Sequence, residues 1–234
     1  MLKDRLRRLF LGGGPVPKDQ PAAFGPKAVI AEAAPANPAG TSYERHSHGL
    51  EQFSGPLHGH PGLRVLDLGG ATQANVSFIT NLGHKLYSDA FLRALETASF
   101  VSGEGPEWPS SAEAEAFLDQ TLGFPEAHFD GILLWDALEF LPPAMLKATV
   151  DRLFKIVRPG AYMLVFFHAD EKAATVPVYS YRISSANTLQ LAHREMRRPV
   201  QRFNNRGVEK LFHRFQSVKF FLARDNLREV IVRR

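Results

Sequence analysis

Several strand-like segments of this sequence end in glycine or in an acidic residue. The segment RVLDLG at 64–69 runs into a glycine turn, a later segment ends at Asp89, and Asp136 follows an apolar segment at 129–135. Glycine lets the backbone approach a ligand, and a carboxylate accepts hydrogen bonds from hydroxyl groups. Ligands of open parallel sheets bind at the carboxyl ends of the strands. We therefore expect these strand ends to form one ligand site.

Three other side chains are candidates for moving a proton, should the reaction need a base. His168 ends an apolar segment at 161–168, and Tyr179 and Tyr181 follow it in a less regular stretch. Histidine and tyrosine both serve as general bases in enzymes. None of the three lies in a specific motif, so the sequence assigns no catalytic residue.

Four histidines form two His-x-His pairs, His46 with His48 and His58 with His60. Neutral imidazoles are common metal ligands. No carboxylate or further ligand pattern accompanies the pairs, and the segment is loop-like. We therefore predict no metal site and expect the histidines in a lid ahead of the first strand. The sequence has no cysteine, which excludes disulfides, thiolate metal sites and cysteine nucleophiles.

The apolar pattern around these residues alternates between strands and helices. The expected strands cover residues 64–69, 84–89, 100–101, 129–135 and 161–168, and the expected helices cover 72–82, 91–98, 110–122, 143–157 and 207–215. Ser110 and Glu113 fit a capping box, and Gly83 fits a C-terminal cap. Such alternation predicts a mainly parallel sheet with helices on both faces.

The last two expected strands, 217–224 and 227–234, are separated only by Asp225 and Asn226. Both residues tolerate positive φ, which favours a tight antiparallel hairpin. The predicted fold is therefore α/β, with a seven-stranded, mostly parallel sheet and an antiparallel C-terminal hairpin. A dinucleotide dehydrogenase normally keeps its sheet parallel to the edge, so the hairpin argues against a nicotinamide cofactor.

The expected domain organisation has two parts. Residues 1–60 are interpreted as a partly flexible N-terminal arm and linker, because 12–40 are rich in Gly, Pro and Ala and lack periodicity. Residues 61–234 are interpreted as the globular domain. The less regular stretch at 170–205 is expected to be an insertion on the substrate side.

From its first strand onward the chain resembles class I S-adenosylmethionine-dependent methyltransferases. The segment VLDLGGA at 65–71 resembles the first motif of the family, and Asp89 stands where the family places an acidic ribose ligand. The segments at 124–141 and 154–160 resemble the fourth-strand region and the turn before the fifth strand. The resemblance implies a Rossmann-like fold and S-adenosylmethionine as the cofactor. It implies cofactor contacts from Asp67, Gly69, Gly70, Ala71, Gln73, Asp89, Trp135 and Asp136.

The first motif departs from the pattern of the family. The family usually has three glycines at alternate positions, where this sequence has Gly69, Ala71 and Gln73. Gln73 places a long side chain near the start of the following helix. The expected function is an S-adenosylmethionine-dependent methyltransferase. A catalytically inactive or repurposed relative and an NAD-dependent enzyme are the alternatives, because fold alone does not fix function.

Three of the site residues also have a structural interpretation. Asp89 and Asp136 are both suited to cap a following helix. Trp135 is suited either to fill the core or to pack near the adenine of the cofactor.

The expected partners follow from charge and composition. The net charge is +4, but residues 194–234 carry 12 Lys and Arg against 4 Asp and Glu. This basic end is interpreted as a solvated face or as a surface for anions such as nucleic acid. A small-molecule or lipid-like methyl acceptor is our first choice, and residues 1–11 permit peripheral membrane contact. With no export signal, we expect a cytoplasmic protein.

Overall fold

A computed structural model of the chain describes residues 42–98, 108–222 and 226–234. All of them belong to one compact unit, Ala33–Arg234. Residues 1–11, the Gly-, Pro- and Ala-rich stretch at 12–40 and the short strand expected at 100–101 lie outside the described residues. Among the described helices, none is long and apolar enough to cross a membrane.

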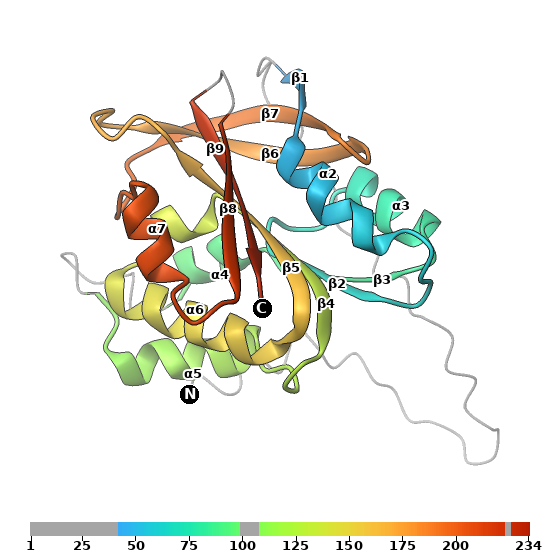
Figure 1. Cartoon of the computed structure of the whole chain (residues 1–234). Helices are drawn as coiled ribbons and strands as arrows, with labels where there is room; N and C mark the ends of the chain where they lie inside the picture. The colour runs from blue at the N-terminus through green and yellow to red at the C-terminus, as the bar shows by residue number, and fades with distance from the viewer. Residues whose placement is uncertain (1–41, 99–107, 223–225) are drawn as a thin grey trace, which may run out of the picture. The chain divides into compact units, whose positions relative to one another are not determined.

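The described part of the central sheet has six strands in the order β3-β2-β4-β5-β9-β8 (Figure 1). The strands are β2 (Arg64–Asp67), β3 (Lys85–Ser88), β4 (Phe129–Trp135), β5 (Val157–His168), β8 (Ser217–Leu222) and β9 (Leu227–Arg233). Neighbours from β3 to β5 are parallel, whereas β9 runs antiparallel to both β5 and β8. The predicted α/β class, a mostly parallel sheet of the Rossmann-like methyltransferase fold, is confirmed. Six of the seven predicted strands lie within the described residues, and the strand predicted at 100–101 lies outside them.

The C-terminal hairpin is also confirmed. β8 and β9 pair from Ser217 opposite Arg233 to Leu222 opposite Arg228. Asn226, just before β9, has φ 59°, the left-handed conformation expected of a residue in this link. β8 is described from Ser217 to Leu222, and residues 223–225 lie outside the described part of the chain.

Side chains of β5 alternate between two apolar clusters, because successive residues of a strand point to opposite faces. Met163, Val165 and Phe167 face a cluster that includes residues of α4 to α7. Leu164 and Phe166 face a second cluster that includes residues of α2, α3, β6 and β7. The helices of the described residues are α2 (His48–Ser54), η1 (Gly55–Leu57), α3 (Gln73–Asn81), α4 (Phe91–Glu96), α5 (Ser111–Thr121), η3 (Ala137–Phe140), α6 (Pro143–Ile156) and α7 (Asn205–Leu211). Both faces of the central sheet are therefore covered.

Two of the predicted helix-end signals are present. Ser110 accepts a hydrogen bond from the backbone N–H of Glu113, whose carboxylate accepts one from the backbone N–H of Ser110, which completes the capping box of α5. Gly83 follows the end of α3 with φ 81°, as expected of a glycine after a helix. These signals act within a few residues, so sequence alone locates them.

The stretch at 170–205 was expected to be less regular, and this expectation is wrong. β6 (Val176–Ser185) and β7 (Thr188–Arg197) form a long antiparallel hairpin, and β1 (Ser42–His46) adds a third strand beside β7. A bulge between Val178 and Tyr179 shifts the apolar alternation of β6 from one phase to the other. The broken alternation explains why the strand pattern was missed.

The prediction of a loop-like segment at 41–60 is also wrong for most of its length. Residues 42–57 form β1, α2 and η1. Phe53 of α2 is buried against the central sheet, where a Cβ on Gly131 of β4 would lie 2.9 Å from its ring. β1 pairs with residues 188–192 of β7, so no local pattern signals this strand.

Candidate functional site

The glycine turn after β2 is bonded to the end of β3. The backbone N–H of Asp89 donates to the carbonyl of Asp67 (3.0 Å), and that of Gly70 donates to the carbonyl of Asp89 (3.1 Å). Gly70 has φ 87°, which L-residues with a side chain rarely adopt. Thr72 then caps α3 by accepting from the backbone N–H of Asn75. The turn therefore lies at the carboxyl ends of two neighbouring parallel strands, as predicted.

Asp67 is buried beneath this turn, and other residues of the chain donate hydrogen bonds to both oxygens of its carboxylate. Oδ1 accepts from the backbone N–H of Gly69 (2.9 Å) and from Nε1 of Trp135 (2.7 Å), while Oδ2 accepts from Nδ2 of Asn75 (2.8 Å). Burial raises the pKa of the Asp67 carboxyl, although all three hydrogen bonds act against the rise. Asp67 thus fixes the turn from below.

The packing of Trp135 against the turn leaves no room for a side chain at Gly69. A Cβ at Gly69 would lie 2.5 Å from Cδ1 of the Trp135 indole. Trp135 is buried and has φ 53°, an outlying conformation for a bulky residue. Such strained residues persist only where the surroundings hold them, and they are frequent at functional sites.

Asp89 has a carboxylate that no other described residue binds. The residue is half-buried, no hydrogen bond to its side chain occurs within the described part of the chain, and burial raises its pKa. The alternative of a helix cap is not observed, because α4 begins after Ala90 with no side-chain cap. Asp89 therefore presents a hydrogen-bond acceptor beside Gly69 and Gly70.

Ala71 and Gln73 occupy the two positions where the family pattern has glycine. Both residues are exposed. The side-chain amide of Gln73 donates to Oγ of Ser77 (3.1 Å), one turn further along α3. The long side chain is therefore directed along the helix surface.

Trp135, Asp136 and Tyr181 form a buried group at the end of β4. The rings of Trp135 and Tyr181 stack with centroids 4.8 Å apart, and the Tyr181 hydroxyl donates to Oδ2 of Asp136 (3.0 Å). Burial raises the pKa of Asp136 to about 6, and it also raises the pKa of Tyr181 well above its usual value of 10. Asp136 makes no side-chain cap on η3, so its capping alternative is not observed.

His168 forms a second buried pair with Glu139 of η3. Oε2 of Glu139 lies 2.6 Å from Nδ1 of His168 and also accepts from its backbone N–H, while Nε2 lies 3.0 Å from the carbonyl of Pro177. A carbonyl only accepts, so Nε2 carries a proton. Burial lowers the pKa of His168, but the hydrogen bond and charge of Glu139 outweigh it and the pKa is raised. Both ring nitrogens of His168 are therefore engaged by other residues of the chain, and the Glu139 carboxylate favours the protonated form of the ring.

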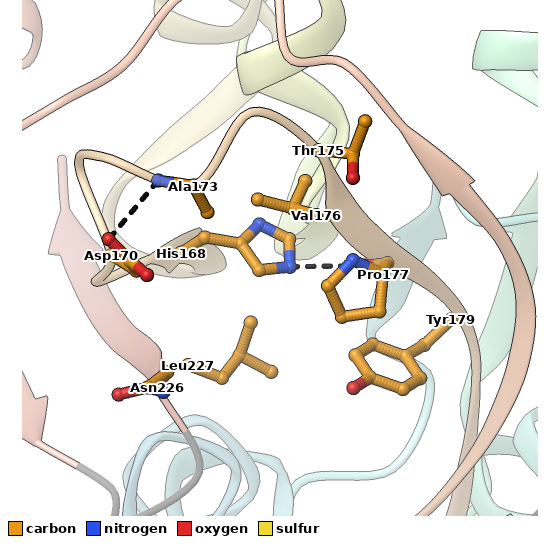
Figure 2. Close-up of a pocket in the computed structure, with 9 residues that line it drawn as sticks. All are labelled: His168, Asp170, Ala173, Thr175, Val176, Pro177, Tyr179, Asn226 and Leu227. Carbon is orange, nitrogen blue, oxygen red and sulfur yellow. Dashed lines mark hydrogen bonds between the residues drawn. The ribbon is translucent and has the colours of Figure 1, made fainter.

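A pocket of about 170 Å³ opens beside this pair (Figure 2). Its lining comes from the end of β5, the start of β6 and the link before β9, and includes His168, Asp170, Tyr179 and Asn226. Figure 2 shows the His168 ring among the lining side chains, with Nε2 turned toward Pro177. Of the three proton-transfer candidates, His168 and Tyr179 line this pocket, whereas Tyr181 is buried beside Asp136.

Sequence reasoning missed two residues that hold the site together. Asn75 of α3 donates to Asp67 and to the carbonyl of Tyr181, and accepts from the backbone N–H of Ile183. Glu139 binds His168 and also accepts at its carbonyl from the backbone N–H groups of residues 200 and 201. Asn75 lies in the first turn of the expected helix at 72–82, where no local pattern marks it. Glu139 stands three residues after Asp136 and was visible as a polar residue in an apolar segment.

Comparison with known proteins gives structural neighbours only. No protein-family profile and no curated protein sequence matches this chain. Similar solved structures include the 1,6-didemethyltoxoflavin-N1-methyltransferase of Burkholderia thailandensis, with TM-score 0.43, 16% identity and coverage of 80% of this chain and 79% of that one. A SAM-dependent methyltransferase from Archaeoglobus fulgidus has TM-score 0.42, 12% identity and coverage of 78% and 88%. The glycopeptide N-methyltransferase MtfA, complexed with S-adenosylmethionine, has TM-score 0.40, 13% identity and coverage of 78% and 91%.

Proposed function

We propose that this chain is a class I S-adenosylmethionine-dependent methyltransferase that acts on a small-molecule or lipid-like acceptor. The observation that carries the proposal is the Asp89 carboxylate, half-buried and without a hydrogen-bond donor in the described chain, beside the Gly69–Gly70 turn. A carboxylate in this position suits the two hydroxyl groups of a ribose. The donor and acceptor chemistry at this edge of the sheet therefore fits the cofactor.

The roles of the other predicted cofactor residues follow from their contacts. Gly69 and Gly70 bring the backbone to the ligand, and Asp67 holds their turn from beneath. Trp135 and Asp136 form the buried base of the site. Gln73, which is bonded to Ser77, is directed along the surface of α3.

Methyl transfer from the sulfonium group of S-adenosylmethionine requires the protein mainly to align the acceptor and to exclude water. When bound, S-adenosylmethionine supplies a methyl group on an already activated leaving group. The residues of the chain then have to orient the acceptor. Because both ring nitrogens of His168 are engaged by Glu139 and Pro177, His168 serves in this proposal as a fixed part of the pocket wall and not as a base. Tyr179, whose ring lines the pocket, is the remaining candidate for a base.

The size of the pocket and the use of the basic residues both favour a small acceptor. The pocket volume of about 170 Å³ is below the range of about 300–1,000 Å³ that is typical of sites for drug-sized ligands. Part of the basic charge in residues 194–234 is neutralised within the chain: Arg197 pairs with Glu195, and Arg214 pairs with Asp151. This pairing weakens the case for nucleic acid.

Calorimetric titration of the full chain with S-adenosylhomocysteine tests the proposal. Asp89→Ala should weaken binding by about 1.5–3 kcal/mol, the range for hydrogen bonds to a charged group, which corresponds to roughly 10–100-fold. Glu126→Ala, which removes an exposed carboxylate elsewhere, is the matched control and should leave the affinity unchanged. Equal affinity in the Asp89 variant and the wild type would overturn the ribose assignment.

A repurposed binding protein is the second candidate, and one observation favours it. Of the three candidates for a base, Tyr181 is buried with a raised pKa and both ring nitrogens of His168 are engaged, so only Tyr179 remains for proton transfer. Wild-type chain that binds S-adenosylhomocysteine but transfers no methyl group to any member of a metabolite panel would support this candidate. Absence of binding would contradict both candidates.

A further inference from the structure

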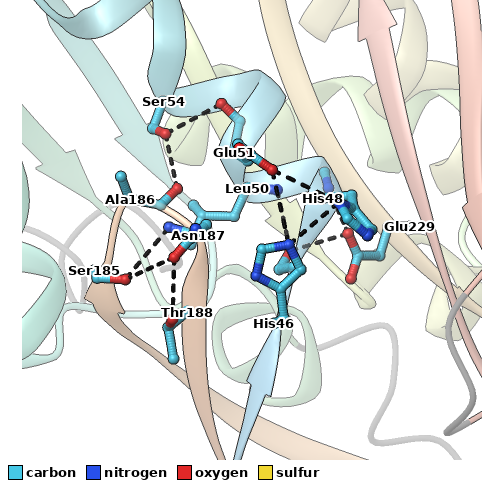
Figure 3. A network of polar contacts seen from close by, with 12 residues as sticks. His46, His48, Leu50, Glu51, Ser54, Ser185, Ala186, Asn187, Thr188 and Glu229 are labelled. Carbon is cyan, nitrogen blue, oxygen red and sulfur yellow. Dashed lines mark hydrogen bonds and ion pairs between the residues drawn. The ribbon is translucent and has the colours of Figure 1, made fainter.

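The two histidines closest to β1 lie together with a carboxylate on the surface of the domain. His46 is the last residue of β1, His48 is the first residue of α2, and Glu51 follows one helical turn later. Figure 3 shows the three side chains turned toward one another. Among the described residues, they form the one group of three or more His, Cys, Asp or Glu side chains whose donor atoms all lie within 4.8 Å of one another.

The spacing of the three donor atoms is that of metal ligands. Nε2 of His46 lies 3.2 Å from Nδ1 of His48, and Oε2 of Glu51 lies 3.7 Å from the first nitrogen and 3.6 Å from the second. Tetrahedral zinc has ligands at about 2.0–2.1 Å, which places neighbouring donor atoms about 3.3 Å apart. An ion can therefore enter with small side-chain movements.

The backbone that carries the histidines is held firmly. Ser47, between them, is fully buried: its hydroxyl accepts from the backbone N–H of Leu50 and donates to Glu229 of β9, and its backbone N–H donates to the carbonyl of Asn187. Arg45 forms a buried ion pair with the same Glu229. Supporting contacts of this kind preorganise a metal site, because the ligands do not have to be ordered when the ion binds.

We propose that His46, His48 and Glu51 bind a zinc ion, with water in the fourth position. Two imidazoles and one carboxylate match the preference of zinc for nitrogen and oxygen ligands in an open site. The side chains of the three residues are 48%, 62% and 57% exposed, which leaves room for entry of the ion and for the water. Bound zinc joins the end of β1 to the first turn of α2.

The prediction that there is no metal site was based on the absence of a carboxylate near the histidine pairs. Glu51 lies only three residues after His48 in the sequence, but it becomes a neighbour because residues 48–54 form a helix rather than a loop. The second pair does not join the group. Nδ1 of His58 is bonded to the carbonyl of Ser54 (2.9 Å), and His60 is exposed.

Zinc titration of the full chain tests this site, with a fluorescent chelator as competitor. We expect one equivalent of zinc to bind and to raise the thermal unfolding midpoint of the protein. This rise should disappear when EDTA is added. His46→Ala and His48→Ala should each weaken binding by more than about 100-fold, because removal of supporting residues alone typically costs about 10–100-fold. Glu51→Gln should also weaken binding, since the carboxylate charge is lost.

The double variant His58→Ala/His60→Ala is the matched control, because it removes a second His-x-His pair from the same region. It should bind zinc as the wild type does. Zinc affinity that is unchanged in the His46 and His48 variants, or lost in the control, would overturn the proposal, as would a wild type that does not compete with the chelator. The readout is independent of methyl transfer, so failure here leaves the proposed function standing.

Discussion

At the scale of single residues, the glycine turn shows how a departure from a family pattern is accommodated. Gln73 occupies a position where glycine is usual, yet its amide is bonded to Ser77 on the exposed surface of α3. Gly69, by contrast, has no room for a side chain, because Trp135 packs against it. The glycine that the chain retains is the one that its own packing requires.

The variant Gln73→Gly tests this interpretation. We expect its affinity for S-adenosylhomocysteine to change by less than about threefold, because the Gln73 side chain points along α3. Glycine at the start of the helix should lower the free energy of unfolding by about 0.5–1 kcal/mol. Calorimetry and urea unfolding measure the two effects. A large gain in affinity would instead mean that the Gln73 side chain competes with the ligand, as expected of an inactive relative.

The sequence predicts the positions of the site residues but not all of their contacts. Gly70 and Asp89 were expected at the ends of neighbouring strands, and the structure bonds them to each other. Asp67 was expected to touch the cofactor, but its partners Trp135 and Asn75 come from 68 and 8 residues away. Distant residues decide that the Asp67 carboxylate is bonded, whereas that of Asp89 has no hydrogen bond within the described residues. The spacing of residues within a motif does not encode this difference.

At the scale of elements, Asn75 joins three parts of the domain. Its amide lies in the first turn of α3 and is bonded to Asp67 at the end of β2 and to the backbone of Tyr181 and Ile183 in β6. The second sheet is thereby fixed over the start of α3. One polar side chain thus joins a helix, a central strand and the β6–β7 hairpin.

Replacing Asn75 with alanine should therefore destabilise the domain by about 2–4 kcal/mol, because it leaves a buried carboxylate oxygen and a backbone N–H without partners. The loss is measured by urea unfolding, and faster amide exchange is expected in residues 176–197. Asn81→Ala, at the exposed end of the same helix, should change stability by less than about 0.5 kcal/mol. Similar stabilities for the two variants would show that the Asn75 network is dispensable.

Elements with local signals were predicted, and those defined by distant pairing were not. The capping box of α5 and the apolar segment of β4 lie within a few residues, and both were located correctly. β1 has only Arg45 among its five residues buried, and its partner β7 follows about 140 residues later. A short polar edge strand of this kind forms because its partner provides hydrogen bonds, not because its own sequence favours it.

At the scale of the whole molecule, the domain buries several ionisable groups at the carboxyl edge of its sheet. Asp136, Glu139 and His168 are each less than 10% exposed. Burial disfavours the charged form of a carboxyl, and this effect raises the pKa of Asp136 from 3.8 to about 6. Stability near neutral pH is therefore reduced by the presence of a charged Asp136.

The direction of the pH dependence follows from the raised pKa of Asp136. Between pH 3.8 and about 6 the folded state binds more protons at this residue than the unfolded state, so its contribution to stability falls as the pH rises through this window. The raised pKa of His168 acts in the same direction at higher pH: its stabilisation is complete below about 6.5 and is lost above the folded pKa. At neutral pH the ionised Asp136 therefore lowers the free energy of unfolding of the domain.

Asp136→Asn tests this dependence. The neutral amide oxygen still accepts from the Tyr181 hydroxyl, so the variant should be more stable than the wild type at pH 7.5, by up to about 3 kcal/mol at about 1.4 kcal/mol per pH unit of pKa change. The difference should vanish near pH 4, where the wild-type carboxyl is protonated. Urea unfolding at both pH values measures it. A variant equally destabilised at both pH values would mean that packing, not charge, dominates at this position.

The placement of β9 has a consequence for folding during synthesis on the ribosome. Residues 227–233 are inserted between β5 and β8, and six of these seven residues are buried. Until β9 leaves the exit tunnel, the apolar edge of β5 has no partner, although β5 itself was translated about 60 residues earlier. An unpaired apolar edge promotes aggregation. The nascent chain therefore passes through an interval, between translation of β5 and of β9, in which this edge is open to pairing with other chains.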